Sequence, residues 1–171
     1  MKADIVSHER GHLRLMVPSD LEQVLKWRNH ENIRKYMFTQ HKIKMDEHKK
    51  WFKKSLKNPD KHLLIFEAEG SSVGFLQFKS LNSGLVADWG FYLAPDAPKN
   101  VRKNFGKIAL AYGFDKLNFH KICGRALAIN EKSIRFHLDL GFRQEGRLRE
   151  QYFDGKNYYD VICFGILNSE N

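Results

Sequence analysis

Short apolar runs separated by turn residues dominate the chain and predict a sheet of seven strands. The first run, His12–Val17, alternates apolar and polar positions and ends at Pro18. The six later strands are predicted at Leu63–Ala68, Val73–Phe78, Leu85–Leu93, Lys121–Ala128, Phe142–Tyr152 and Tyr158–Leu167. Glu69–Ser72 and Asn82–Gly84 have turn chemistry, so an antiparallel meander is the simplest arrangement for the three strands between positions 63 and 93.

Four segments with helical spacing lie between these strands. Ser19 and Glu22 have the spacing of a capping box, in which each side chain satisfies a free backbone N–H at the start of a helix. That helix starts at Leu21, and the other three are predicted at Lys44–Leu56, Asn104–Leu117 and Asn130–Leu140. The order is strand, two helices, three strands, helix, strand, helix and two strands, which predicts one mixed α/β domain.

The helix Asn104–Leu117 connects two strands that are expected to lie parallel at their starts. Open parallel sheets bind ligands at the carboxyl ends of such strands, near the N-terminus of the connecting helix. The ligand site is therefore expected around Phe91 to Gly106.

The length of 171 residues and the apolar content of 42% suit one domain spanning residues 1–171. No apolar run approaches the ~18 residues needed to cross a bilayer, and the polar segment Met1–Gly11 lacks the core of a signal peptide. We expect a cytoplasmic protein that does not enter a membrane. Cys123 and Cys163 lie in strand-like runs and are predicted to be buried thiols, with neither a metal site nor a disulfide.

The net charge of +9 has three interpretations: nucleic-acid binding, a solvated basic surface, or a cleft for small phosphorylated ligands. The basic residues are spread along the whole chain, which argues against a dedicated nucleic-acid module.

Four blocks follow one another in the second half of the chain: Asp88–Pro95, Lys99–Gly106, Ala128–His137 and Leu140–Phe142. Together they resemble the acetyl-coenzyme A core of the GCN5-related N-acetyltransferase (GNAT) superfamily. Further segments resemble the aminosugar N-acetyltransferases of pseudaminic acid biosynthesis: Trp27–His30, Met37–Phe38, Glu47–His48, Trp51–Phe52, Trp89–Tyr92 and Glu145–Arg149. The resemblance covers residues 12–167 and implies a mostly antiparallel seven-stranded sheet, whose fourth and fifth strands are parallel and splay apart, with about four flanking helices.

The resemblance implies acetyl-CoA as cosubstrate and no metal. Backbone groups of Phe91, Tyr92 and Leu93 are expected to hold the pantetheine arm and the thioester oxygen. The other cofactor-binding residues implied are Lys99, Asn100, Arg102, Lys103, Asn104, Phe105 and Gly106 around the start of the connecting helix, and Asn130, Ser133 and Phe136 in the next helix.

Three positions depart from the family pattern. Asn100 and Arg102 stand where the family usually has glycine, so either the loop takes another path or the Arg102 guanidinium itself meets the pyrophosphate. His137 stands where many relatives have the tyrosine that protonates the departing thiolate. Histidine can deliver a proton, so His137 is the predicted catalytic residue, with a structural role as the alternative.

The acceptor side is implied to lie in the N-terminal half. Arg28 and His48 are expected to contact the phosphates or ribose of a nucleotide, and Met37, Phe38 and Trp51 to wall a slot for a deoxysugar, with ordinary core packing as the alternative for these three. The basic character of positions 27–51 favours an anionic acceptor over a polyamine or a peptide amine. Asp88 and Glu47 are both candidates for the base.

The leading hypothesis is therefore acetyl transfer from acetyl-CoA to the 4-amino group of a UDP-linked 4-amino-4,6-dideoxy sugar, a small-molecule acceptor. Acetylation of ribosomal-protein N-termini or of polyamines is the alternative within the superfamily. A non-catalytic protein that binds acyl-CoA or a nucleotide sugar is a further alternative, and RNA binding is supported by net charge alone. The sequence leaves open whether the chain is a monomer or a homodimer.

Overall fold

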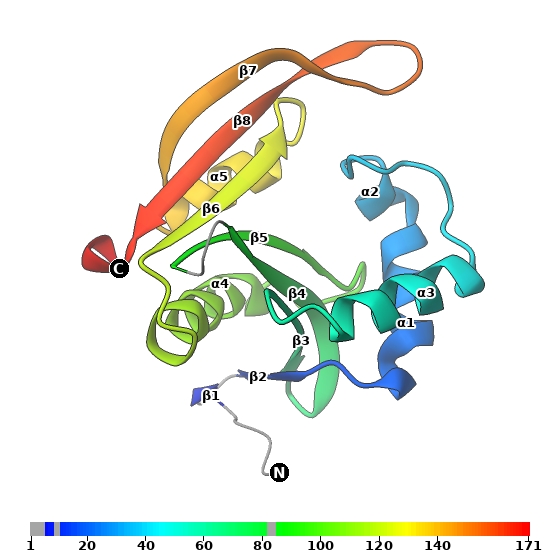
Figure 1. Cartoon of the computed structure of the whole chain (residues 1–171), viewed down its shortest axis with the longest axis vertical. Helices are drawn as coiled ribbons and strands as arrows, with labels where there is room; N and C mark the ends of the chain where they lie inside the picture. Colours follow the sequence, from blue (N-terminus) through cyan, green and yellow to red (C-terminus); the bar gives the residue numbers. More distant parts are fainter. Residues whose placement is uncertain (1–5, 9–10, 82–84) are drawn as a thin grey trace.

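A mixed sheet with eight strands among its described residues runs through the molecule (Figure 1). The structure is a computed structural model that describes residues 6–8, 11–81 and 85–171. The strands are β1 (Val6–His8), β2 (Gly11–Leu15), β3 (Lys61–Ala68), β4 (Ser71–Leu81), β5 (Val86–Leu93), β6 (Lys121–Leu127), β7 (Arg143–Phe153) and β8 (Tyr158–Leu167). Their order in the sheet is β1-β2-β3-β4-β5-β6-β8-β7. Only β5 and β6 pair in parallel in this part of the chain.

The predicted fold class is confirmed. All seven predicted strands are present, and β1 adds an eighth by pairing with β2 in antiparallel register. The predicted turn Asn82–Gly84 lies outside the described residues, as does most of the polar segment Met1–Gly11.

Five α-helices in the described part of the chain flank this sheet, one more than predicted. They are α1 (Leu21–Asn29), α2 (Glu31–Arg34), α3 (Met45–Leu56), α4 (Val101–Ala111) and α5 (Glu131–Asp139). The additional helix is α2, a single turn, and a π-helical segment, Tyr112–Lys116, extends α4. Within the described residues, no helix has the length and apolar content needed to cross a membrane.

The sheet separates two hydrophobic cores because the central strands are apolar on both faces. In β3, Leu64 and Phe66 belong to the larger core, which α4 and α5 cover, whereas Leu63 and Ile65 belong to a smaller core with residues of α1 and α3. Successive residues of a strand point to opposite faces, so the continuous apolar run of β3 fits a position between two helical layers. α1 to α3 therefore lie on one side of the sheet, and α4 and α5 on the other (Figure 1).

The start of α1 is fixed by an ion pair. The prediction of a capping box formed by Ser19 and Glu22 is wrong. No side chain caps α1. Instead, the carboxylate of Asp20, which is 7% exposed, accepts two hydrogen bonds of 2.8 Å from the Arg14 guanidinium and a third from the Val17 N–H. Arg14 also donates to Glu67 at 2.6 Å, so the pair joins the start of α1 to β2 and β3. Burial alone would raise the pKa of Asp20, but the hydrogen bonds and the charge of Arg14 outweigh it and lower this pKa.

The Asp20→Ala substitution should lower the free energy of unfolding by about 1–3 kcal/mol, because the two Nη groups of Arg14 and the Val17 N–H lose their acceptor. Since the pKa of Asp20 is lowered on folding, this contribution is present above the unfolded pKa and is lost as the pH falls through the folded value. Urea unfolding at neutral and acid pH measures both effects. Glu22→Ala is the control and should change stability by less than about 0.5 kcal/mol; equal losses for the two variants would contradict this assignment.

Candidate active site

The sheet opens between β5 and β6. These strands pair only from Val86–Asp88 to Lys121–Cys123 and then separate, while β5 continues to pair with β4 and β6 with β8. From Trp89 onward, the edge of β5 that faces β6 therefore has no strand partner among the described residues. Free backbone N–H and C=O groups at such an opening can bind an extended ligand as an added strand would.

A cluster of aromatic side chains fills the space beneath this opening. The Trp89 ring lies 4.9 Å from the ring of Phe142, the residue before β7, and 4.9 Å from that of Phe91, measured between ring centroids. From α5, His137 receives a 3.0 Å hydrogen bond from the Trp89 indole N–H. Gly124 of β6 provides the room, since a Cβ there would lie 2.3 Å from His137 Nε2. The cluster thus holds the two strands apart.

The position of His137 favours the structural alternative, because the ring is buried and hydrogen-bonded at both nitrogens, and the ring also lines the cavity that contains Asp88 and Phe91. Its side chain is 1% exposed, its Nδ1 bonds to the Ser133 carbonyl at 2.8 Å, and its Nε2 accepts from Trp89. Because the carbonyl can only accept, Nδ1 carries the proton and both ring nitrogens are engaged. Burial lowers the pKa of His137 to about 4, so the ring is neutral near pH 7 and has no proton available for a thiolate.

A groove of about 270 Å³ runs between the free edge of β5 and α5. It is lined by eight of the residues predicted for the cofactor: Phe91, Tyr92, Leu93, Arg102, Phe105, Asn130, Ser133 and Phe136. The predicted cap is present, because the Asn130 side chain accepts a hydrogen bond from the Ser133 N–H at 3.2 Å. Ser133 therefore presents a small side chain at the fixed first turn of α5, where a ligand can approach closely.

The missing glycines cause no backbone strain. α4 begins at Val101, three residues before the predicted start at Asn104, and Asn100 has φ −72°. Neither Asn100 nor Arg102 is among the described residues with positive φ. These positions already belong to the helix start, where glycine has no advantage, and this path of the chain is compatible with a contact between the Arg102 guanidinium and the pyrophosphate.

Arg102 stands at the boundary between the groove and a second, basic cavity. Its guanidinium lies over the Phe136 ring, with Cζ 5.0 Å from the centroid, and donates to the Lys132 carbonyl at 3.2 Å. The basic cavity measures about 660 Å³, and its cationic lining consists of Lys99, Arg102, Lys103, Lys132 and Arg135. Five cations around a helix start that has no acidic residue in its first turn suit a polyphosphate.

Three residues predicted for the cofactor have other surroundings. Asn100, Asn104 and Gly106 line neither the groove nor the basic cavity. Gly106 is buried where α4 packs on α5, and a Cβ there would lie 2.6 Å from the Leu140 side chain. Its role is therefore close helix packing.

The acceptor cavity lies on the other side of β5 and has a volume of about 370 Å³. All five residues predicted for the acceptor line it: Arg28, Met37, Phe38, His48 and Trp51. They come from α1, from α3 and from the segment between α2 and α3. Phe75, Gln77 and Tyr92 form the wall contributed by the sheet.

Two buried nitrogen atoms among the residues of this cavity have no hydrogen-bond partner: Nη1 of Arg28 and Nε2 of His48. Arg28 is held by a 2.7 Å hydrogen bond from Nη2 to the Thr39 carbonyl, which leaves Nη1 available. Burial lowers the pKa of Arg28 from its ordinary value, which at neutral pH still leaves the guanidinium charged. A half-buried cation whose buried Nη1 has no partner indicates an anionic or oxygen-rich ligand.

A third cavity, of about 380 Å³, connects the acceptor cavity with the cofactor groove. All three cavities share Met37 and Phe91, so the transfer point is expected at the opening beside Phe91. Asp88, one of the two predicted candidates for the base, also lines this junction. Glu47, the other predicted base, bonds to His41 at 3.0 Å.

Sequence reasoning missed Tyr36, Gln77 and Tyr152. Tyr36 lines both the junction and the groove, and Gln77 lines the junction and the acceptor cavity. Tyr152 of β7 contacts Phe38, with ring centroids 5.7 Å apart. The sequence around Tyr36 has no helix or strand periodicity that would indicate its position. Gln77 and Tyr152 lie in strands, where only the register decides which side chains face the cavity.

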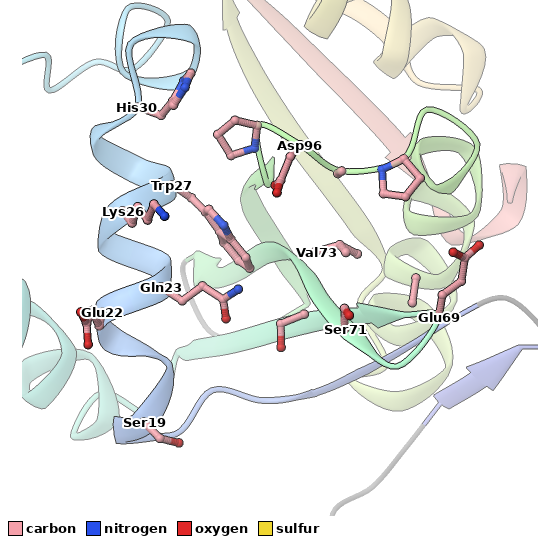
Figure 2. Close-up of a pocket in the computed structure, with 15 residues that line it drawn as sticks. Ser19, Glu22, Gln23, Lys26, Trp27, His30, Glu69, Ser71, Val73 and Asp96 are labelled. Carbon is pink, nitrogen blue, oxygen red and sulfur yellow. The ribbon is translucent and has the colours of Figure 1, made fainter.

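A larger cavity, of about 800 Å³, lies beside α1 and contains none of the residues at the opening (Figure 2). Its walls come from α1, the β3–β4 turn and residues 95–98. Glu22 and Lys26 of α1, Glu69 and Asp96 give it mixed charge. Size alone therefore does not identify the active site in this molecule.

The fold and the converging cavities define an acetyl-CoA-dependent N-acetyltransferase, in which cofactor and amine approach the opening in the sheet from two sides. Residues 10–143 match the family model of the acetyltransferase (GNAT) domain. The chain therefore belongs to the GNAT acetyltransferases. Among the described residues there is no group of three or more His, Cys, Asp or Glu side chains suited to a metal ion.

The chain is similar to several curated acetyltransferases. The chain is 27% identical to spermidine N(1)-acetyltransferase of Vibrio cholerae over 161 residues, 92% of this chain and 93% of that protein. It is 25% identical to acetyltransferase PseH of Campylobacter jejuni over 143 residues, 83% and 84% of the two chains. The crystal structure of the Vibrio cholerae spermidine N-acetyltransferase with CoA and spermine superposes with a TM-score of 0.88 at 26% identity, covering 95% of this chain and 98% of that one.

The His137→Phe substitution should lower stability by about 1–3 kcal/mol, because the buried Trp89 N–H loses its acceptor. It should leave kcat of the folded enzyme within about threefold, whereas loss of a general acid costs about 100-fold or more. Urea unfolding measures the stability, and CoA release measures kcat. His120→Phe, at an exposed position, is the control for both.

Folding depresses the pKa of His137, so the free energy of unfolding of the unaltered protein should fall by about 3 kcal/mol as the pH falls from about 6.5 to 4. The His137→Phe variant should not show this loss.

Proposed function

We propose that this enzyme transfers acetyl from acetyl-CoA to the 4-amino group of a UDP-linked 4-amino-4,6-dideoxy sugar. The observation that carries the proposal is the buried, unpartnered Nη1 of Arg28 in the acceptor cavity. A cation in this position repels a polyamine and attracts a diphosphate. The aromatic walls from Phe38 and Trp51 suit the apolar faces of a deoxysugar, and similarity to PseH supports the same assignment.

Acetyl-CoA supplies an activated thioester to the amine. The free backbone groups of β5 around Phe91 hold the pantetheine arm and donate to the thioester oxygen as negative charge develops there. Lys99, Arg102 and Lys103 bind the pyrophosphate at the start of α4. Phe91 and Met37 bring the two substrates together at the junction, so much of the rate enhancement comes from placing the amine beside the carbonyl.

Asp88 is the carboxylate placed to receive the proton of the amine, because it lines the junction while Glu47 is engaged by His41. With His137 enclosed, the proton for the departing thiolate comes from another group at the junction. Tyr36 and Ser133 carry the hydroxyl groups that line both the junction and the groove.

Polyamine acetylation is the second candidate. Its support is the similarity to spermidine N(1)-acetyltransferase, which is 27% over 161 residues and exceeds the 25% over 143 residues found with PseH. A polyamine site needs carboxylates, and the lining of the acceptor cavity contains one, Glu47, which is already paired. The charge of Arg28 therefore favours the anionic acceptor.

The acceptor is identified by CoA release with a panel of UDP-4-amino-4,6-dideoxy sugar, spermidine and an N-terminal peptide. We expect turnover with the sugar nucleotide. Arg28→Met should raise KM for it by about 10- to 100-fold, because a charge-assisted hydrogen bond is lost, while KM for acetyl-CoA stays unchanged. Lys50→Met on the exposed face of α3 is the matched control. Turnover with spermidine and none with the sugar nucleotide would replace this proposal by the polyamine function.

The Arg102→Met substitution should weaken CoA binding by about 10-fold or more in calorimetry, because the guanidinium bonds the pyrophosphate directly. Arg102→Lys should recover only part of the affinity, because it keeps the charge but lacks the planar guanidinium that can donate two parallel hydrogen bonds. Lys107→Met, on the exposed side of α4, serves as control. Equal affinity for CoA in Arg102→Met and the unaltered protein would show that Arg102 only joins α4 to α5.

A further inference from the structure

One polar side chain stands at the boundary between the acceptor cavity and the junction. Five described residues line both cavities: Met37, Phe38, Gln77, Gly90 and Phe91. Three of them have apolar side chains and Gly90 has none, so Gln77 carries the only polar side chain of the five. An amine that reaches the thioester from the acceptor cavity has to cross this boundary. The only side chain with which it can form a hydrogen bond there is that of Gln77.

The amide of Gln77 is available for such a contact. The residue is half-buried in β4, and no hydrogen bond joins its amide to another described residue. Polar groups that are withdrawn from water normally have partners, because leaving them without one costs free energy. For packing alone, an apolar side chain of the same size, such as methionine, would serve better. The unused amide therefore indicates contact with a ligand.

Gly90 makes room for this amide. The two residues are opposite each other in β4 and β5, and a Cβ at position 90 would lie 3.2 Å from Nε2 and 3.5 Å from Cγ of Gln77. The Gln77 side chain therefore lies across β5. Gly90 is not among the described residues with positive φ, so the backbone itself does not require glycine. Glycine inside a strand often marks the close approach of another group, which here is the Gln77 amide.

This position is next to the expected transfer point. Gly90 lies between Trp89, from which β5 no longer pairs with β6, and Phe91, whose backbone is proposed to hold the thioester. Asp88, the proposed base, is two residues away in β5 and lines the same junction. Side chains at opposite and diagonal positions of neighbouring strands reach one another. Gln77 and Asp88 can therefore contact one bound amine.

We propose that the side-chain oxygen of Gln77 accepts a hydrogen bond from the acceptor amine and so directs the lone pair of its nitrogen at the thioester carbon. This inference rests on the proposed function, with Asp88 as the base, and adds the group that orients the amine. A neutral primary amine has two N–H groups and one lone pair. With one N–H on Gln77 and the other facing Asp88, the lone pair remains for the attack. The C–N bond forms, the C–S bond breaks with its electron pair on sulfur, and the proton that nitrogen loses passes to Asp88.

A neutral amide suits this position better than a carboxylate. A carboxylate beside the amine would stabilise the ammonium form and raise the pKa of the amine, and an ammonium group has no lone pair for the attack. The amide oxygen of Gln77 accepts the same hydrogen bond and stays uncharged. It therefore orients the amine without holding it in its unreactive form.

Steady-state kinetics with the UDP-4-amino-4,6-dideoxy sugar measures the contribution of Gln77. Gln77→Met keeps the size of the side chain and removes the hydrogen-bond acceptor, so kcat should fall by about 10- to 100-fold while the Kd for CoA in calorimetry stays unchanged. Gln144→Met, at an exposed position of β7, is the matched control. Thermal melting verifies that each variant is folded. Equal kcat in folded Gln77→Met and the unaltered protein would overturn the proposal.

A substitution at Gly90 tests the position of the amide without removing it. The added Cβ of Gly90→Ala should displace the Gln77 side chain and lower kcat by about 10-fold. In the Gln77→Ala background there is no amide to displace, so the same substitution should change kcat by less than about twofold. Equal losses in the two backgrounds would show that Gly90 acts through the backbone of β5, and the inference would be wrong.

The pH dependence of kcat distinguishes contact with the amine from a role in packing. In Gln77→Glu the new carboxylate should raise the pKa of the bound amine, so the rise of kcat with pH should move upward by about one pH unit or more. A role in packing predicts a lower kcat with no such shift, which would contradict the proposal. The other titratable residues that line the two cavities are present in both proteins: Arg28, Tyr36, Glu47, His48, Lys79, Asp88, Tyr92, Arg125 and His137.

Spermidine separates failure of this inference from failure of the proposed function. If the unaltered protein turns over spermidine and not the sugar nucleotide, the proposed function is wrong, and the same variants are compared with spermidine, whose primary amines offer the same two N–H groups. A lower kcat of Gln77→Met with the acceptor that is turned over supports the inference. An unchanged kcat with that acceptor overturns it.

Discussion

The opening between β5 and β6 depends on one buried contact, the hydrogen bond from the Trp89 indole to His137. Strands that begin as parallel neighbours tend to remain paired. Here the aromatic cluster around Trp89 and His137 acts as a wedge that prevents further pairing of β5 with β6. Gly124 makes the wedge possible, because any side chain at that position would collide with the imidazole. The free edge of β5, and with it the whole cofactor groove, follows from this packing.

The two substrates meet surfaces of different character on the two sides of β5. On the α4 and α5 side, exposed and half-buried cations surround a helix start, which suits a polyphosphate that must bind and leave. On the α1 and α3 side, the cavity is mainly apolar and its polar atoms are few, buried and partly unused. Unused buried atoms cost stability in the free protein, so their retention indicates a ligand that satisfies them.

The fold could be predicted from the sequence because each strand and helix has its own periodic signal, and the order of elements limits the topology. The residues at the acceptor cavity could be located because a resemblance placed them, and all five line it. Their chemistry could not be predicted. The unpartnered Nε2 of His48 follows from the burial of its ring against Trp51, and the enclosure of His137 depends on Gly124, a contact between segments far apart in sequence. The sequence gives the type of each side chain, and only tertiary packing decides its protonation state and its access to a ligand.

The aromatic wedge also constrains how the chain folds. Its members come from positions 89 to 164, so the wedge is assembled only after β6, α5 and β8 have joined the meander formed by β3 to β5. Contacts between residues so far apart in the sequence form late and slowly during folding. Until they form, the free edge of β5 lies next to an exposed apolar surface that other chains can pair with. The same unpaired strand edge that binds the cofactor in the native protein is thus a point of aggregation during synthesis.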